Sequence, residues 1–384
     1  MVKDTGLPLE TDVFVAGGGP AGLSAAIAAR RCGLSVAVAD ISLCPIDKAC
    51  GEGIMPDGVA ALRRLGVALG ADEGFPFRGI SFIGAGASAE ARFPEGFGLG
   101  VRRTTLHRLL MTRASEAGVV MTWGTPVRGI GGGRVRVGDR EVHSRWVIGA
   151  DGQNSRVRQW AGLEPAREGS RRVGFRGHFR LTPWTDLVEV HWHRRCQAYV
   201  TPVGSREVCV AIIGSDPSLR MSDLPELFPD LGRRLRGARP STPVMGGMSV
   251  SRRLPSVVRG NVALVGDASG SVDAVTGEGL SLTFRQAAAL GEALAAGDPT
   301  AYQMAHRRIG RVPQLMAHLL LAMDGRTWLR HRALRALAGH PQMFARLLAV
   351  HVGALPPTAI GLNVVAGFAW QLLTAGASVG YGAP

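Results

Sequence analysis

The segment Gly17-Gly18-Gly19-Pro20-Ala21-Gly22 constrains the fold of this 384-residue chain more than any other. It follows the short apolar run Val13–Ala16 and precedes an alanine-rich stretch that predicts a helix over 20–31. In such a unit, Gly17 permits a tight turn, Gly19 lets backbone N–H groups approach a pyrophosphate, and Gly22 lets the helix pack closely on the sheet. A second apolar run over 34–39 completes a βαβ unit. The chain is therefore predicted to open with a parallel sheet that binds a dinucleotide.

Asp40 ends the second predicted strand. An acidic residue at this point is placed to accept hydrogen bonds from a ribose 2′-OH. Because a 2′-phosphate would be repelled there, Asp40 favours FAD or NAD over NADP as the bound dinucleotide.

Two later segments also carry polar residues where apolar strands end. Residues 149–158 follow a buried run and contain Asp151 and Gly152, although alone they also fit a turn and a helix capped by Asn154 or Ser155. Residues 260–279 deliver Gly266 and Asp267 at the carboxyl end of a strand, where ligands bind in open α/β sheets. Gly277-Glu278-Gly279 then opens a helix predicted over 279–296. The free N–H groups of that helix form an anion site suited to the negative charge of a reduced flavin.

Together, the three segments resemble those of the FAD-dependent monooxygenases with a p-hydroxybenzoate-hydroxylase-like fold. That superfamily also contains geranylgeranyl reductases and flavin-dependent halogenases. The resemblance covers about residues 10 to 300 and implies that Asp40 binds the adenosine ribose, Asp267 lies near the ribityl chain and Arg103 lies near the phosphates. The cofactor-binding residues that it implies are Gly17, Gly19, Pro20, Ala21, Gly22, Asp40, Arg103, Asp151, Gly152, Gly266, Asp267, Gly277, Glu278 and Gly279.

The stretch Lys48-Ala-Cys-Gly-Glu-Gly-Ile-Met-Pro56 is similar to the Cys-Gly-rich loop of the geranylgeranyl reductase-like branch. The Thr-Gly-Glu-Gly form of the third segment resembles the same branch and the halogenases. This likeness implies that Cys50 lies near the isoalloxazine. The alternative is that Cys50 is a small buried residue without a chemical role.

The predicted fold class is α/β, with a Rossmann-type FAD-binding domain interrupted by an antiparallel-sheet substrate domain and followed by a C-terminal helical region. The FAD-binding domain is assigned to residues 1–79, 98–171 and 253–300, and the substrate domain to 80–97 and 172–252. Residues 301–384 form the helical region, with breaks predicted at Pro313, Gly325, Pro341 and Pro356.

The resemblance implies an NAD(P)H-dependent monooxygenase that hydroxylates or epoxidises a lipophilic, aromatic or polyketide-like molecule through a flavin C4a-hydroperoxide, as in secondary metabolism. The alternatives are a reductase of isoprenoid-like double bonds, a halogenase, and a flavin-binding protein that has lost catalysis. A halogenase needs a lysine near its tunnel, and Lys48 is the only internal lysine. Many members also carry a Trp-x-Trp-x-Ile motif, which Val190-His-Trp-His193 does not match.

The sequence leaves the catalytic side chains unknown, with Cys50, His191 and His193 as candidates. The two histidines share one face of a predicted strand, where they wall the substrate cavity or face solvent. No metal site is expected, because no third ligand lies nearby in the sequence.

Composition excludes several classes of partner and compartment. The net charge is +14, but the basic residues are scattered arginines with only two lysines, so no nucleic acid is expected as a partner. The five cysteines form no CxxC pair and the N-terminus lacks the apolar run of a signal peptide, which favours a reducing, cytoplasmic location. Residues 347–384 contain no Asp, Glu, Lys or Arg, which leaves peripheral membrane contact open as an expectation.

Overall fold

The computed structural model describes residues 6–70, 72–84, 86–164 and 167–359. Its first sheet has the order β18-β19-β11-β1-β2-β8, and the pairs β19–β11, β11–β1, β1–β2 and β2–β8 are parallel. The predicted opening βαβ unit is present as β1, α1 and β2. The parallel strands and the shorter antiparallel strands at their margin are β1 (Glu10–Ala16), β2 (Val36–Asp40), β8 (Val120–Trp123), β9 (Val127–Gly131), β10 (Arg134–Val137), β11 (Arg140–Gly149), β18 (Val258–Arg259) and β19 (Val262–Leu264).

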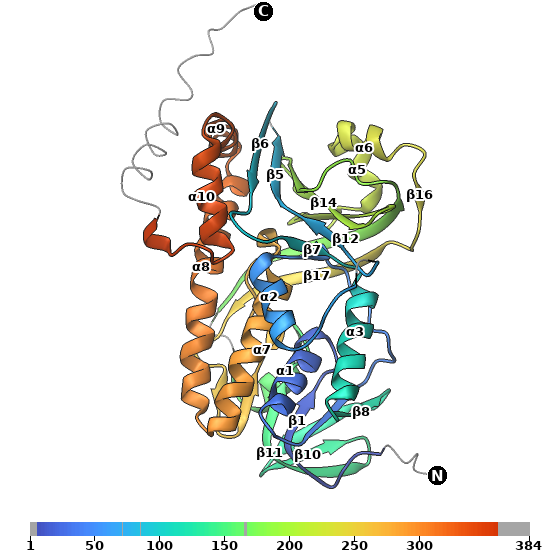
Figure 1. Cartoon of the computed structure of the whole chain (residues 1–384), viewed down its shortest axis with the longest axis vertical. Coiled ribbons are helices and arrows are strands. Elements are labelled where there is room, and N and C mark those ends of the chain that lie inside the picture. The colour runs from blue at the N-terminus through green and yellow to red at the C-terminus, as the bar shows by residue number, and fades with distance from the viewer. Residues whose placement is uncertain (1–5, 71, 85, 165–166, 360–384) are drawn as a thin grey trace, which may run out of the picture.

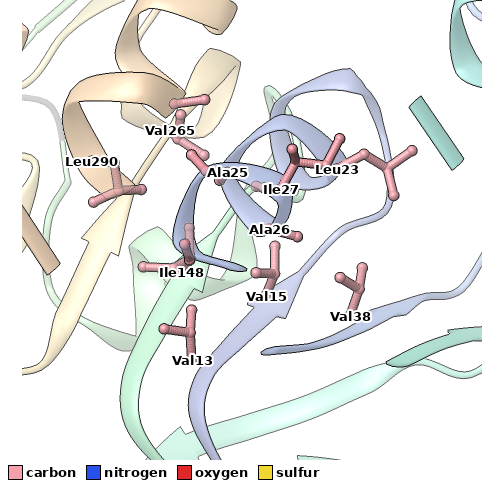
Figure 2. Packing of buried hydrophobic residues seen from close by; sticks show 14 of the residues in the cluster. Val13, Val15, Leu23, Ala25, Ala26, Ile27, Val38, Ile148, Val265 and Leu290 are labelled. Atoms are coloured by element: carbon pink, nitrogen blue, oxygen red, sulfur yellow. The ribbon is translucent and has the colours of Figure 1, made fainter. Parts of the chain in front are cut away.

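The core of this region is packed tightly because its helices carry small residues. Figure 2 shows Ala25, Ala26 and Ile27 of α1 (Pro20–Arg31) lying over Val13 and Val15 of β1. On the other side of α1 lies α7 (Gly279–Ala296), and a Cβ on its Gly291 would come within 2.8 Å of Ala28. The close contact of α1 with α7 brings the first and third sequence segments together.

The second sheet has the order β16-β12-β15-β14-β13-β5-β6, with β17 also paired to β12. Every pair is antiparallel except β13–β5. Its strands are β5 (Gly79–Gly84), β6 (Ala87–Arg92), β12 (Arg167–Arg180), β13 (Val188–Trp192), β14 (Cys196–Gly204), β15 (Glu207–Gly214), β16 (Arg239–Pro240) and β17 (Met245–Arg253). We propose that the domain limits follow this division, because the sheet draws its strands only from residues 79–92 and 167–253.

A small sheet and several helices complete the arrangement (Figure 1). The strands β3 (Gly53–Ile54), β4 (Phe75–Phe77) and β7 (Gly98–Gly100) lie between the two large sheets, and α9 and α10 pack against β6. The remaining helices are α2 (Pro56–Arg64), α3 (Arg103–Glu116), α4 (Arg156–Trp160), α5 (Leu224–Leu227), α6 (Pro229–Leu235), α8 (Pro299–Gly325), α9 (Thr327–Gly339) and α10 (Pro341–His351). Short 3₁₀ turns cover Met221–Asp223, Gly266–Ser269, Ala274–Thr276 and Pro357–Ala359. This architecture confirms the predicted fold class.

The C-terminal helices differ from the prediction at one position. A break was expected at Pro313, but α8 continues through it. Proline removes one backbone hydrogen bond, to the carbonyl of Ile309, at a cost of about 3 kcal/mol. Ile309, Pro313 and Met316 are all buried, and this packing holds the helix together across the proline. The other breaks fall near the expected places, since α8 ends at Gly325 and α10 begins at Pro341.

None of the described helices combines the length and the hydropathy needed to cross a bilayer. Most of the uncharged segment that suggested membrane contact, from residue 360 onward, lies outside the described residues.

Candidate functional site

The glycine loop after β1 has the shape that its sequence predicts. Gly17 adopts a φ of +108°, and a Cβ there would lie 2.4 Å from the carbonyl oxygen of Ala150. A Cβ on Gly22 would lie only 1.8 Å from the carbonyl oxygen of Gly17. A Cβ on Gly19, in contrast, would meet nothing within 4 Å, so the loop leaves open space at the N-terminus of α1. No side chain caps this helix, and its free N–H groups fit a pyrophosphate.

The side chains of Asp40 and His107 hold the glycine loop through hydrogen bonds to the backbone of Gly18. Asp40 accepts hydrogen bonds from the backbone N–H of Gly18 at 2.6 Å and of Ser42 at 2.7 Å. A carboxylate has about four acceptor positions, so Asp40 retains capacity for a ribose hydroxyl. His107 of α3 lies 2.9 Å from the Gly18 carbonyl through Nε2 and accepts from the Ile46 N–H at 3.4 Å through Nδ1. Burial lowers the pKa of His107, and these contacts fit its neutral Nε2–H tautomer.

His107 is not among the site residues that the sequence predicts. The one feature that could have indicated a role for His107 is its position on the buried face of α3, four residues after Arg103. A lone histidine in a helix carries no local sign of its partner, which lies 89 residues away at Gly18.

The second segment forms a capped turn at the carboxyl end of β11. Asp151 accepts from the Ser155 hydroxyl and from the backbone N–H of Arg156 and Val157, and Ser155 in turn caps α4 through the Arg158 N–H at 2.9 Å. Arg158 is buried and donates to the carbonyl oxygens of Gln153 at 3.0 Å and Ala268 at 3.3 Å. Arg158 therefore fastens the second segment to the third.

The third segment turns sharply against α1. Gly266 has a φ of +63°, and a Cβ there would lie 2.6 Å from the Cβ of Ala21. Asp267 follows with an exposed side chain. Gly277 adopts a left-handed conformation at +67°, and α7 begins at Gly279 without a side-chain cap. Its N-terminal N–H groups are thus free for an anionic group.

One cavity of about 1740 Å³ connects these segments. This volume exceeds the roughly 300–1,000 Å³ typical of a single small ligand, so it can hold a dinucleotide and a second molecule together. Three of the expected cofactor residues, Gly17, Gly22 and Asp40, support the site from outside the lining. Those that line the cavity are Gly19, Pro20, Ala21, Arg103, Asp151, Gly152, Gly266, Asp267, Gly277, Glu278 and Gly279.

The loop that contains Cys50 also borders the cavity. The Cys50 thiol accepts from the Glu52 N–H at 3.3 Å, and burial raises its pKa, which keeps the thiol uncharged. Glu52 is buried in a left-handed conformation and fastens the loop, because it accepts from the Arg103 N–H at 2.9 Å and contacts His178 of β12 at 2.7 Å. Arg176, also from β12, pairs with Asp47 at 2.5 Å.

Among the described residues, Glu52, His178 and Cys209 bring three potential metal ligands within 4.8 Å of one another. The contact between Glu52 Oε2 and His178 Nε2 is itself a short hydrogen bond. Burial raises the pKa of the Cys209 thiol well above its usual range, which leaves it uncharged. These groups already serve one another as hydrogen-bond partners, and the cluster acts as the anchor of the Cys50 loop.

A buried ionic network joins the third segment to the second sheet and to α8. Arg172 of β12 is 4% exposed and lies 3.0 Å from Asp273 and 2.5 Å from Asp324. Gln197 of β14 contacts both Arg172 and Asp324. Burial acts to lower the pKa of Arg172, but the two carboxylates outweigh it and raise the pKa. The arginine is thus fully charged and positions the turn that leads into Gly277–Gly279.

His191 and His193 lie away from the cavity, which corrects the expectation that they wall it. Both imidazoles pack edge-on against Phe228, which lies between α5 and α6, and His191 contacts Glu189 at 2.9 Å. Alternation along β13 instead directs Val188 and Val190 to the cavity. Tyr199 of the neighbouring strand lines the cavity, and its hydroxyl donates to the Val275 carbonyl at 2.8 Å.

Comparisons with known proteins agree with this geometry. A sequence family described as an FAD binding domain matches residues 10–217. The menaquinone reductase of Mycolicibacterium smegmatis is 29% identical over 324 residues, which cover 77% of this chain and 78% of that protein. The digeranylgeranylglycerophospholipid reductase 1 of Methanopyrus kandleri is 31% identical over 300 residues, 71% of this chain and 77% of that protein.

A relative with a different named reaction matches over a similar length. The protoasukamycin 4-monooxygenase of Streptomyces nodosus subsp. asukaensis is 28% identical over 340 residues, 77% of this chain and 83% of that protein. Among solved structures, a flavoprotein/dehydrogenase from Cytophaga hutchinsonii superposes with a TM-score of 0.79 at 17% identity, over 91% of this chain and 94% of that chain. The structural likeness supports the fold, and the reactions named for these sequence relatives include both reduction and oxygenation.

Proposed function

Because this chain belongs to the family of FAD-binding-domain flavoproteins, and is therefore an FAD-dependent oxidoreductase, we propose that it saturates carbon–carbon double bonds in a long isoprenoid-like lipid. The observation that supports this proposal most directly is the apolar end of the cavity. Its walls come from β5, β13, α9 and α10. Figure 1 shows α9 and α10 beside β6, far from β1 and β11.

The walls at this end suit a hydrocarbon chain. His351 is the only titratable residue that these four elements contribute to the lining, and burial lowers its pKa to about 4, so it is uncharged. A hydroxylated ligand would leave its polar groups unpaired here, at a cost of about 1–3 kcal/mol for each group. The other contributions are Ile80, Phe82, Val188, Val190, Leu329, Ala333, Leu337, Met343, Phe344, Leu347 and Leu348.

The rest of the cavity fits FAD. The N–H groups at the start of α1 would hold the pyrophosphate, Asp40 the ribose, Asp267 the ribityl chain, and the N-terminus of α7 the pyrimidine edge of the flavin. When bound, FAD supplies the hydride for the reduction, and we propose NAD(P)H as the electron donor that restores it. The protein contributes orientation and a cavity that excludes water.

A second candidate is the monooxygenase reaction that the sequence first suggested. The similarity to protoasukamycin 4-monooxygenase favours it, because the match extends over most of both chains. The apolar walls argue for reduction instead, since the uncharged imidazole of His351 is the one polar side chain that β5, β13, α9 and α10 offer to orient a phenol. Halogenation gains little support, because Lys48 lies beside Gly152 in the cofactor part of the cavity.

Filling the apolar end tests the substrate class. Leu337 of α9 is 4% exposed in the cavity wall, and tryptophan there would occupy the space of a chain. We expect Leu337→Trp to lower turnover of menaquinone with a long isoprenoid side chain by at least about tenfold, with FAD content unchanged. A menaquinone analogue with one isoprene unit is expected to retain its turnover.

The matched control is Leu9→Trp, because Leu9 is 78% exposed and does not line the cavity. Equal losses on the long and the short probe would contradict a chain-binding compartment. Steady-state rates under anaerobic conditions, normalised to bound flavin, provide the measurement.

The mouth of the cavity on α8 suggests how such a lipid arrives. Met304, Leu315 and Leu319 are 62%, 48% and 49% exposed, and they line the mouth together with Arg308 and Arg311. Asp324 is the only acidic residue between Pro299 and Ala359, and Arg172 already pairs with it. We propose that this basic and apolar rim meets an anionic lipid surface.

Vesicle binding tests this surface. Each basic residue near an anionic bilayer contributes about 1 kcal/mol, so Arg308→Ala/Arg311→Ala should weaken binding to phosphatidylglycerol-containing vesicles by about 30-fold. The control pair is Arg128→Ala/Arg136→Ala, which removes two exposed arginines from β9 and β10. Co-sedimentation at low salt is the measurement, and equal binding by both double variants would contradict the proposed surface.

A further inference from the structure

Glu278 stands between the two glycines that open α7, and its side chain is almost fully enclosed. The residue is 1% exposed and lines the cavity. Its Oε2 atom is buried without a hydrogen-bond partner among the described residues. Its Oε1 atom lies 3.8 Å from Nε2 of His351 on α10, which lines the same cavity. A buried carboxyl oxygen without a partner is costly, so it calls for a chemical explanation.

The other buried carboxyl groups around the cavity are already neutralised or hydrogen-bonded. Asp273 pairs with Arg172 and Glu52 contacts His178, while the half-buried Asp151 accepts from the backbone N–H of Arg156. Asp267 is exposed and free to meet the cofactor. Among the described residues that line the cavity, Glu278 is therefore the carboxyl group that is buried and has an oxygen without a hydrogen-bond partner.

The groups that face Glu278 favour its protonated form. Burial raises its pKa well above the usual range, and the negative charge of Asp57 on α2 acts in the same direction. Arg285 of α7 opposes them, but it is bound to Asp57 at 2.8 Å. His351 is uncharged for the reason given above. Both shifts favour a protonated carboxyl group beside a neutral imidazole.

We propose that Glu278 is the proton donor for double-bond saturation, a role that rests on the proposed reductase function. When bound, reduced FAD would supply the hydride that one carbon of the double bond accepts. The π electron pair then takes the proton of the Glu278 carboxyl group at the other carbon, so two C–H bonds replace one π bond. The resulting carboxylate lies at the N-terminus of α7, where the helix N–H groups stabilise negative charge. Glu278 regains a proton from solvent by way of His351.

The direct test replaces the acid with its amide. Glu278→Gln should lower saturation of menaquinone about 100-fold, within the range for loss of a general acid. FAD affinity and the rate of flavin reduction by NADPH should stay within twofold of the wild type. The matched control is Glu292→Gln, an exposed acid on the same helix, which should leave all three quantities unchanged.

A second readout does not depend on turnover. The infrared spectrum of the oxidised holoenzyme should contain a protonated carboxyl C=O band that disappears in Glu278→Gln and persists in Glu292→Gln. The wild-type rate should also fall as pH rises through the raised pKa of Glu278, because the donor is then deprotonated. The amide variant should lose this pH dependence.

The possible failures are distinguishable. Saturation by Glu278→Gln at near wild-type rate, or absence of the carboxyl band, would overturn the donor role and leave the reductase function standing. Loss of FAD from the variant would also overturn it, since the carboxyl group would then serve to build the cofactor site. Oxygen consumption by the wild type without saturation of the probe would overturn the reductase function, and the donor role with it.

Discussion

Substitution of Gly22 by alanine is expected to abolish retention of FAD. The new Cβ would lie 1.8 Å from the carbonyl oxygen of Gly17 and 3.2 Å from Val15, so the start of α1 must move away from β1. That movement displaces the N–H groups that face the pyrophosphate, and close helix–strand packing is the role of the third glycine in such loops. We expect FAD affinity to fall at least about 100-fold, on the scale of roughly 3 kcal/mol lost for a displaced anion site.

The ratio of flavin to protein absorbance after gel filtration, followed by fluorescence titration of the apoprotein, measures this effect. A second variant separates binding from folding: Gly19→Val places its side chain in open space, so the apoprotein should fold, yet the side chain occupies the path of the pyrophosphate. The control is Gly131→Ala, where a Cβ would meet nothing within 4 Å. Full FAD content in both Gly22→Ala and Gly19→Val would contradict the assigned cofactor site.

Replacement of Arg172 by methionine should destabilise the protein severely. The change leaves Asp273 and Asp324 without the buried guanidinium that contacts both at 3.0 Å or less. Breaking a buried ionic group by removing one partner costs about 3–5 kcal/mol. Urea denaturation of the holoenzyme should show this loss as a lower transition midpoint.

A compensated variant tests the cause of the loss. In Arg172→Met/Asp273→Asn/Asp324→Asn the two charges left by the first change are also removed, and most of the stability should return. The neighbouring Arg171, with a side chain that is 67% exposed, provides the control, because Arg171→Ala should change stability by less than about 1 kcal/mol. Equal stability of the single and triple variants would contradict an electrostatic origin.

The elements around the cofactor segments were predictable because their signals are local. The glycine loop carries its turn, and α7 its helical periodicity, within the segment itself, and α7 spans Gly279–Ala296 as predicted. The family match agrees with FAD as the cofactor. The contacts that organise the site were not predictable, because each joins residues far apart in sequence. Arg172 and Asp324, for example, are separated by 152 positions.

The placement of His191 and His193 illustrates another limit of prediction from the sequence. Strand alternation showed that the two side chains share a face, but both faces of the second sheet are covered. The cavity lies on one face, and α5 and α6 lie on the other with Leu224, Phe228 and Leu231 buried against it. Strand alternation alone does not show which of the two covered faces borders the cavity. For Glu278, the sequence predicted the free backbone N–H groups of its segment at the start of α7. It assigned no chemical role to the Glu278 side chain.

The most direct test of the proposed reaction is the mass of the product formed without oxygen. Holoenzyme, NADPH and menaquinone are incubated under strictly anaerobic conditions, and the lipid is analysed by mass spectrometry. Double-bond reduction predicts a product that, after its quinone ring has been reoxidised, has gained two hydrogen atoms in the isoprenoid chain, at least one of them deuterium when the solvent is D₂O. A lipid that is unchanged without oxygen, and that gains an oxygen atom when air is admitted, would contradict the reductase function and favour the monooxygenase.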